Sequence, residues 1–286
     1  MNLEEKFGAL KRKGEKALVG FVTAGYPSAE ATTKIALAML KGGVDILELG
    51  LPFSDPIADG VTIQQASERS LRAGMNPDLY FEVAAGIKKV EKVCLTYYNL
   101  VLQRGLEKFV SDCEAAGIKG VVVPDLPVEE ARPLLKVCDR YDETDLIFLV
   151  APTTTEKRLA KILEAASGFV YVVSLLGVTG ARETISSSVS PLIRRIREQE
   201  RVGGREVPLA VGFGISKPEQ VRTVCGSGAA DAETDANADG AIVGSAFIKI
   251  IEQGLARGSE GAGDEEKMLR EIEGFAGSLK RETLVA

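Results

Sequence analysis

Short apolar runs rich in Val, Ile and Leu alternate along the chain with longer amphipathic segments. Each short run is apolar at nearly every position rather than at every second one, which is typical of parallel strands buried on both faces. The sequence therefore predicts eight strands. They cover Ala17–Thr23, Val44–Leu49, Val93–Tyr97, Gly120–Pro124, Leu146–Ala151, Phe169–Val173, Val207–Val211 and Ala241–Val243.

The segments between these runs have the spacing of amphipathic helices. Clear examples are Ala29–Lys41, Gly105–Ala116, Val128–Asp139 and Thr155–Ala166. A strand followed by a helix, repeated eight times, predicts an α/β fold of the (β/α)8 TIM barrel type. A doubly wound open sheet is the structural alternative. We expect Met1–Lys13 to form an extra N-terminal helix below the barrel, and Glu265–Lys280 to form the last helix.

The length of 286 residues permits two domains. No linker divides the chain into two parts of different amino-acid composition, so we expect residues 1–286 to form a single barrel domain. Two segments depart from the repeat. Leu175–Ser190 is rich in Gly, Thr and Ser and follows the sixth strand, where we expect a closing lid. Ala229–Asp239 is small and acidic, and we expect it to be a solvated insertion.

Charge and composition exclude several function classes. The formal net charge of −6 argues against nucleic acid, which is bound by clustered Lys and Arg. No run is long and apolar enough for a membrane span, and the charged segment Met1–Gly14 lacks the apolar core of a signal peptide. We therefore expect a cytoplasmic protein. The four cysteines form no CxxC pair, which favours buried free thiols.

The chain contains no histidine. This absence removes Ser-His-Asp and Cys-His nucleophile systems and the commonest zinc ligand. Proton transfer must then come from Asp, Glu, Lys, Tyr or Cys. No Lys stands at the carboxyl end of a predicted strand, which argues against an imine mechanism. We expect metal-independent acid–base chemistry.

Two carboxylates stand where barrel active sites lie, at the carboxyl ends of the strands. Glu48 interrupts the apolar second strand, and burial there would raise its pKa toward neutrality. Asp59 follows on the loop, where we expect it to be more exposed and ionised. Two carboxyls in unlike environments are a candidate acid–base pair. The alternatives are a structural Glu satisfied by a Ser or backbone partner, and an Asp that serves only the turn.

Glycines at two consecutive strand ends indicate a phosphate site. Gly212 and Gly214 follow strand seven, and Gly244 with Ser245 follows strand eight, each just before a helix. Backbone N–H groups and a helix N-terminus can bind an anion there, and these loops are the usual phosphate site of this fold. Gly180, in the loop after strand six, could close over the same group. Ordinary turn glycines are the alternative.

Three aromatic residues stand at or near strand positions facing the same end. Tyr97 and Tyr171 fall at or near the ends of strands three and six, and Phe21 lies on strand one. They are candidates to line an apolar pocket for a planar ring. Packing in the core is the alternative for each of them.

With these residues identified, the chain resembles the alpha subunit of tryptophan synthase from about Leu3 to about Lys280. The most specific stretch is ELGLPFSDPIADG, residues 48–60, followed by Ile63 and Gln64. Further matching motifs are FVTAGYP (21–27), YYN (97–99), PDLP (124–127), GVTG (177–180), GFGIS (212–216) and Gly244-Ser245.

The resemblance implies a reaction that spacing alone does not give. It is the aldol-type cleavage of indole-3-glycerol phosphate to indole and glyceraldehyde 3-phosphate, in tryptophan biosynthesis. Glu48 matches the residue that protonates indole C3, and Asp59 matches the residue that binds the indole N–H. Thr179 matches a lid residue that contacts the Asp. Pocket and phosphate-cradle positions are matched by Phe21, Tyr171, Gly180, Gly214, Gly244 and Ser245.

The resemblance also implies a partner. Family members pair with a beta subunit that carries pyridoxal phosphate and receives the indole, so we expect an alpha2beta2 heterotetramer with no cofactor in this chain. Pro52 and Asp55 match positions that face that partner. The sequence departs from the family at Val61, usually Pro, and at Leu175, Arg in some members.

Two other functions remain open from sequence. One is another phosphate-binding barrel enzyme of the same pathway, an isomerase or an indole-glycerol-phosphate synthase. Such enzymes tend to use Cys with Asp, or Lys with Glu, at strand ends, and this sequence lacks that arrangement. The other is a non-catalytic subunit that only activates its partner, against which the intact pair of Glu48 and Asp59 argues.

Overall fold

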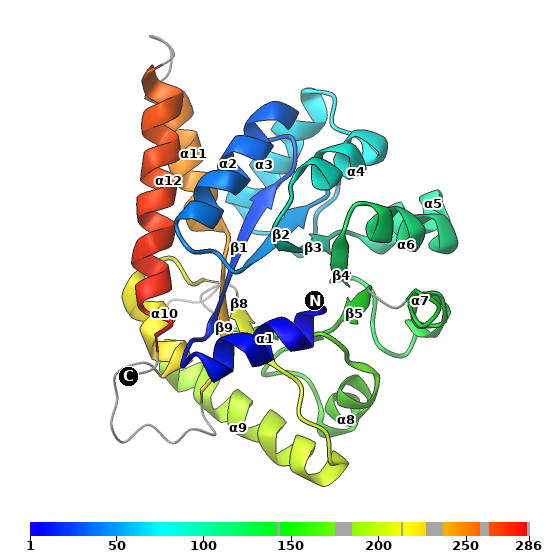
Figure 1. Ribbon diagram of the computed structural model, residues 1–286. Helices are drawn as coiled ribbons and strands as arrows, with labels where there is room; N and C mark the ends of the chain where they lie inside the picture. The colour runs from blue at the N-terminus through cyan, green and yellow to red at the C-terminus, as the bar shows by residue number, and fades with distance from the viewer. Residues whose placement is uncertain (142–143, 175–184, 213, 227–236, 258–262, 285–286) are drawn as a thin grey trace.

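The computed structural model describes residues 1–141, 144–174, 185–212, 214–226, 237–257 and 263–284. In this part of the chain, parallel strands form a ring that is surrounded by helices (Figure 1). The strands are β1 (Ala17–Thr23), β2 (Ile46–Gly50), β3 (Glu91–Leu95), β4 (Ile118–Val122), β5 (Asp145–Ile147), β6 (Leu149–Val150), β7 (Val170–Val173), β8 (Leu209–Gly212) and β9 (Gly240–Val243).

The strand order closes the sheet on itself. It runs β5-β4-β3-β2-β1-β9-β8-β7-β6, and each strand is parallel to its neighbours in this order. The two ends of this order, β5 and β6, are consecutive pieces of one extended run joined by Phe148. The Tyr171 N–H donates to the Phe148 carbonyl at 2.9 Å, which continues the ladder across the junction. The architecture is therefore the predicted TIM barrel, and the open-sheet alternative is excluded.

The helices cover the outside of this ring. They are α1 (Leu3–Arg12), α2 (Ala29–Lys41), α3 (Val61–Arg72), α4 (Pro77–Gly86), α5 (Tyr98–Arg104), α6 (Leu106–Ala115), α7 (Arg132–Cys138), α8 (Glu156–Ala165), α9 (Ile185–Gly203), α10 (Pro218–Cys225), α11 (Ser245–Arg257) and α12 (Gly263–Arg281). Local signals set several starts: the Ser28 hydroxyl accepts from the Ala31 N–H at 3.1 Å and caps α2.

All eight predicted strands are present, with two differences in detail. The fifth divides into β5 and β6. The third ends at Leu95 rather than at Tyr97, so Tyr97 stands beyond the strand as the residue before α5. The predicted helices are confirmed with shifts of a few residues at their ends, which is the usual uncertainty of helix boundaries.

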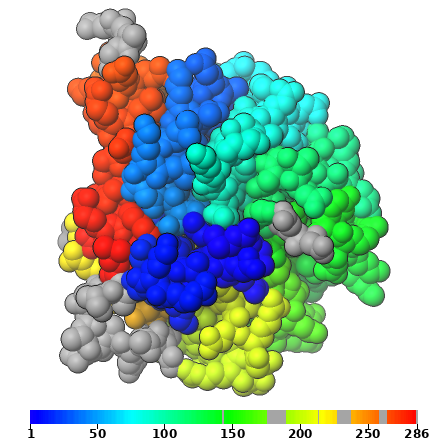
Figure 2. Space-filling model, in the orientation of Figure 1, coloured from blue at the N-terminus to red at the C-terminus, as the bar shows by residue number. Residues whose placement is uncertain are grey.

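The N-terminal helix closes the lower end of the barrel, where the strands begin. Asn2 caps α1 by accepting from the Glu5 N–H at 2.8 Å, and Leu3, Phe7 and Leu10 are buried. Gly120 on β4 leaves room for the Leu3 side chain, and the Phe7 ring packs on Phe169 at 5.6 Å. In the space-filling view α1 covers the middle of this face, between α12 and the helices that follow β3 and β4 (Figure 2).

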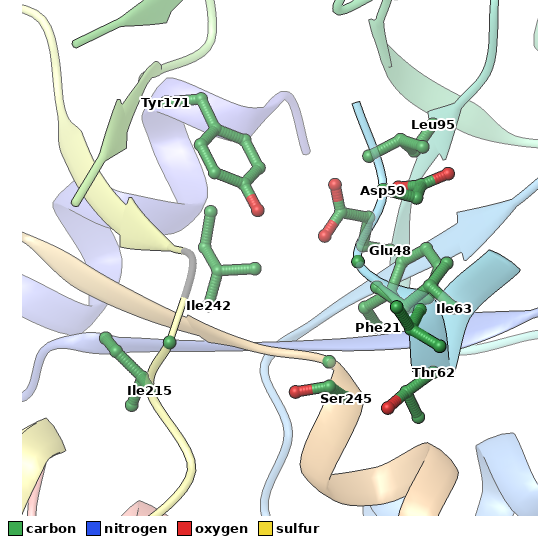
Figure 3. Close-up of a pocket in the computed structure, with 14 residues that line it drawn as sticks. Phe21, Glu48, Asp59, Thr62, Ile63, Leu95, Tyr171, Ile215, Ile242 and Ser245 are labelled. Carbon is green, nitrogen blue, oxygen red and sulfur yellow. The ribbon is translucent and has the colours of Figure 1, made fainter. Parts of the chain in front are cut away.

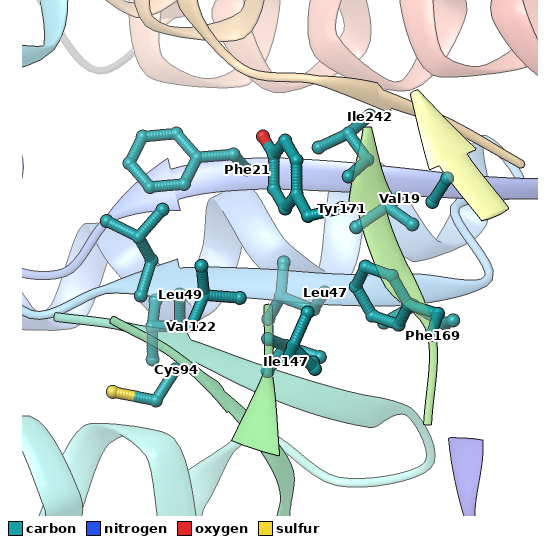
Figure 4. Packing of buried hydrophobic residues seen from close by; sticks show 14 of the residues in the cluster. Val19, Phe21, Leu47, Leu49, Cys94, Val122, Ile147, Phe169, Tyr171 and Ile242 are labelled. Carbon is teal, nitrogen blue, oxygen red and sulfur yellow. The ribbon is translucent and has the colours of Figure 1, made fainter. Parts of the chain in front are cut away.

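Strands all around the ring contribute side chains to the apolar core. Val19 and Phe21 from β1, Leu47 from β2, Ile147 from β5 and Ile242 from β9 belong to one continuous apolar cluster (Figure 4). The hydrophobic fraction of 45% supplies this core and the layer between strands and helices. Close packing fixes the strand ends, and with them the residues that the strands carry to the upper rim.

The described part of the acidic segment before β9 is not a solvated insertion. Asp239 accepts from the guanidinium of Arg197 and from the Leu209 N–H at 2.9 Å, and its carbonyl accepts from the Ala17 N–H at 2.8 Å. It also lies 3.5 Å from the Lys16 ammonium. Asp239 therefore joins α9 to the starts of β1 and β8. Residues 229–236 lie outside the described residues.

The four cysteines are free and buried, as expected. None of the described helices combines the length and the apolar character that crossing a membrane requires.

Substitution Asp239→Ala is expected to lower the free energy of unfolding by about 1.5–3 kcal/mol, because it removes a charged acceptor from a partly buried Arg197. Denaturant unfolding measures this change. The control is Glu198→Ala, since Glu198 is exposed on the same helix and is expected to change stability by less than about 0.5 kcal/mol. Equal changes in the free energy of unfolding for the two substitutions would show that the Asp239 contacts do not stabilise the fold.

Candidate active site

A cavity of about 240 Å³ opens at the upper rim, at the carboxyl ends of the strands. Strands far apart in sequence contribute to it, and α3 and α11 both begin at its wall (Figure 3). The residues that line it are Phe21, Glu48, Asp59, Gly60, Val61, Thr62, Ile63, Leu95, Tyr171, Gly214, Ile215, Ile242, Gly244 and Ser245. Most of this lining is apolar, so the few polar groups decide what the cavity can do.

Glu48 is the buried acid of this cavity. It lies on β2 opposite Phe21 of β1 and Val93 of β3, and only 2% of its surface is exposed. Its Oε1 atom has no hydrogen-bond partner among the residues that the structure describes. Burial raises the pKa of Glu48 to about 8, and the negative charge of Asp59 adds to the rise. The carboxyl group is therefore mostly protonated at neutral pH and can donate a proton.

Asp59 is held by its loop and by two side chains from neighbouring elements. The Tyr97 hydroxyl donates to Asp59 Oδ2 at 3.0 Å and accepts from the Ala58 N–H at 3.1 Å. Gln64, on the first turn of α3, donates from Nε2 to the Asp59 carbonyl at 2.8 Å. Phe53 stacks on the Tyr97 ring at 5.1 Å. These contacts fix the direction in which the carboxylate points.

The pKa of Asp59 is also raised, to about 6, because the group is largely removed from water, although the Tyr97 hydrogen bond lowers it in part. Asp59 is half-buried and therefore more exposed than Glu48, as expected, although it is not open to solvent. The expectation that Asp59 is ionised agrees with its pKa of about 6, which is below 7. At neutral pH the cavity then contains one protonated and one ionised carboxyl, in unlike environments. Figure 3 draws both pointing into the same space.

Phe21 and Tyr171 line the cavity as predicted, and glycines make room for both rings. A Cβ atom at Gly50 would lie 2.8 Å from the Phe21 ring, and one at Gly244 would lie 3.1 Å from the same side chain. A Cβ atom at Gly212 would lie 2.5 Å from the Tyr171 ring and hydroxyl. Side chains at these positions would push the aromatic rings into the cavity.

Two predicted substrate contacts have a different place in the structure. Gly212 is not among the described residues that line the cavity, and the absence of a side chain there leaves space for Tyr171. Tyr97 is not part of the lining either, because β3 ends two residues before it, and it positions Asp59 through its hydroxyl. Both residues act through a neighbour that does line the cavity.

The remaining glycines lie where an anion site requires them. Gly214, with a φ of 87°, and Gly244 line the cavity, and Ser245 is the first residue of α11. The Phe247 N–H donates to the Gly244 carbonyl at 2.9 Å, so Gly244 begins the helix. The N–H groups of the first turn and the helix dipole favour negative charge at this wall. Thr179 and Gly180 lie outside the described residues.

Several lining residues were not found from sequence. Leu95 stands two positions before Tyr97 within the predicted third strand and could have been found from alternation, since residues at i and i+2 of a strand share a face. Ile242 lies inside the predicted eighth strand, and Thr62, Ile63 and Ile215 adjoin the matched motifs. Among the described residues, no group of three or more Cys, Asp or Glu side chains is placed to bind a metal ion.

Comparison with known proteins shows the family of this chain. A family model described as tryptophan synthase alpha chain matches residues 7–283. The chain belongs to the tryptophan synthase alpha chain family. Relatives of that name include one from Methanosarcina acetivorans, 51% identical over 253 residues, covering 88% of this chain and 87% of the relative. Another, from Methanocaldococcus jannaschii, is 49% identical over 271 residues, covering 93% and 90%.

Solved structures of this family have the same fold. A structure of Mycobacterium tuberculosis tryptophan synthase superposes with a TM-score of 0.83 at 32% identity, covering 99% of this chain and 98% of the other. The tryptophan synthase subunit alpha from Legionella pneumophila superposes with a TM-score of 0.81 at 28% identity, covering 99% and 98%.

Substitution Tyr97→Phe is expected to raise the pKa of Asp59 above about 6, because it removes the hydrogen bond that favours the ionised carboxylate. Titration of carboxyl-labelled Asp by NMR measures the shift. Tyr141→Phe is the matched control, since Tyr141 lies beyond α7, away from the cavity, and should leave this titration unchanged. An unchanged Asp59 titration in the Tyr97 variant would contradict the assigned contact.

Proposed function

We propose that this chain is the lyase that cleaves indole-3-glycerol phosphate to indole and glyceraldehyde 3-phosphate, with Glu48 as the proton donor. The observation that carries the proposal is the buried, unpartnered carboxyl of Glu48 in the cavity where α11 begins. A protonated acid and a helix N-terminus suit a substrate with an aromatic ring at one end and a phosphate at the other.

The chemistry begins with binding of the indole ring. Phe21, Leu95 and Ile242 offer apolar surface for it, and the Asp59 carboxylate accepts the hydrogen bond of the ring N–H. Protonated Glu48 donates its proton to ring carbon C3. Positive charge then develops on the ring nitrogen, and the Asp59 carboxylate stabilises it electrostatically.

Cleavage of the bond between C3 and the glyceryl chain follows from this protonation. The bonding electron pair returns to the ring and restores indole, while the hydroxyl on the adjacent carbon loses its proton and becomes the aldehyde. Glu48, now a carboxylate, is the base that accepts this proton, so the acid is regenerated. Every step uses side chains of this chain alone, and we propose no cofactor within it.

The phosphate is proposed to bind at the wall formed by Gly214, Gly244 and Ser245. Gly180 and Thr179 are proposed to contact the same ligand from the segment after β7. The absence of Lys and Cys from the described lining argues against the isomerase and synthase alternatives.

We further propose that the chain pairs with a beta subunit that carries pyridoxal phosphate and consumes the indole, in an alpha2beta2 assembly. Pro52 and Asp55 lie on the loop between β2 and α3, and Ile57 on the same loop is 82% exposed. An exposed apolar side chain beside the catalytic Asp is consistent with a partner surface there. We propose a cytoplasmic location for this assembly.

Substitution Glu48→Gln is expected to lower the rate of indole release by about 100-fold or more, because the amide cannot donate the proton. Binding of glyceraldehyde 3-phosphate should persist, since the anion wall is unchanged. Spectrophotometric assay of indole and calorimetry of ligand binding measure the two effects. Glu114→Gln is the control and should keep full activity, because Glu114 is exposed on the surface of α6. Full activity of the Glu48 variant would refute its assigned role.

The rate is expected to be highest between about pH 6 and about pH 8. It falls below this window as Asp59 takes up a proton, and above it as Glu48 loses one. In Asp59→Asn the alkaline limb should move to lower pH, because the negative charge that raises the pKa of Glu48 is gone. Steady-state rates across this range test both statements, and a flat profile would contradict the pairing.

A further inference from the structure

The cavity has a second polar wall besides the one formed by Gly244 and Ser245. Helices α3 and α11 pack against each other, and the first turn of each lines the cavity. Figure 3 draws Thr62 of α3 and Ser245 of α11 toward one end of the cavity, with Glu48 and Asp59 toward the other. A ligand extended from the two carboxyls to Ser245 therefore passes beside Thr62.

Among the described residues, backbone N–H groups at the start of both helices have no protein acceptor at this wall. In α3 the Ile63 and Gln64 N–H groups donate to the Gly60 carbonyl at 2.9 and 3.0 Å. The N–H groups of Val61 and Thr62 are left without an acceptor among the described residues. Gly60, which precedes α3, gives no side-chain cap, and the first turn contains no acidic residue. The first turn of α11 contains none either. Both helix ends therefore favour an external acceptor.

The side chains at this wall are also free to bind. Within the described part of the chain, the hydroxyls of Thr62 and Ser245 make no hydrogen bond. An independent feature of the same cavity points to a ligand: Glu48 Oε1 is buried without a partner. Buried polar groups are normally satisfied, so the open Glu48 Oε1 marks this cavity as one where a ligand supplies a partner.

We propose that Thr62 is a specificity-determining residue, whose hydroxyl donates a hydrogen bond to the phosphorylated glyceryl chain of the substrate, across from Ser245. The inference rests on the proposed function for the identity of the substrate. In this proposal the phosphorylated glyceryl chain lies between the N-termini of two helices, α3 and α11, rather than at one. Thr62 has no role in binding the indole ring.

The test uses the reverse reaction, in which indole and glyceraldehyde 3-phosphate combine. Thr62→Val removes the hydroxyl and keeps the shape of the side chain. The KM for glyceraldehyde 3-phosphate is expected to rise about tenfold, the effect of one hydrogen bond, while the KM for indole stays unchanged. Thr62→Ser should restore the KM. Thr33→Val on α2, away from the cavity, is the matched control.

The proposal is overturned if the KM for glyceraldehyde 3-phosphate does not change, or if both KM values rise equally. It is also overturned if Thr62→Ser fails to restore binding. Calorimetry with glycerol 3-phosphate tests the contact without turnover, with binding about tenfold weaker in Thr62→Val expected. A wild-type protein that binds this ligand but never forms indole would refute the proposed function, and the effect of Thr62→Val on glycerol 3-phosphate binding would then test the Thr62 contact separately. Thr62→Ala replaces the Val variant if circular dichroism shows that the latter does not fold.

Discussion

The structure depends on one unfavourable feature, a carboxylic acid placed inside a closed apolar barrel. Glu48 lies on β2 between β1 and β3, and it cannot turn outward without moving a strand that pairs on both sides. Burial without a partner costs free energy, and the group lowers that cost by staying protonated. An internal hydrogen-bond partner would stabilise the chain further, but it would compete with a substrate for the same proton. The barrel supplies the rigidity that keeps this arrangement intact.

The second carboxyl acquires the opposite protonation state through its position on a loop. Asp59 is half-buried and receives a hydrogen bond from Tyr97, which favours the ionised form. The negative charge of Asp59 in turn raises the pKa of Glu48, so the ionised Asp59 favours the protonated form of Glu48. A single aromatic hydroxyl beyond the end of β3 thus influences both the acid and the carboxylate. The hydrogen bond from Tyr97 therefore influences both the direction and the protonation state of the Asp59 carboxyl group.

Sequence predicted those parts of the molecule that depend on local pattern. The apolar runs predicted all eight strands, and the position of Glu48 within one of them predicted its burial. Features that depend on packing between distant elements were missed. Gly212 leaves room for the ring of Tyr171 on the neighbouring strand β7, and no pattern within the predicted seventh strand signals that contact. Asp239 appeared as part of an acidic surface segment because Arg197, 42 residues earlier, is not visible as its partner in a linear pattern.

The loop between β2 and α3 connects the chemistry to the outside of the molecule. It carries Asp59 on its inner side and the exposed Ile57 on its outer side, and Gln64 ties it to the first turn of α3. A partner seated on Ile57 would therefore press on the segment that positions the Asp59 carboxylate. Because the charge of Asp59 reaches Glu48, displacement of this loop would alter the protonation of the buried acid as well as the fit of the ring. The same short segment would then couple partner contact, substrate geometry and proton supply, with no further moving part required.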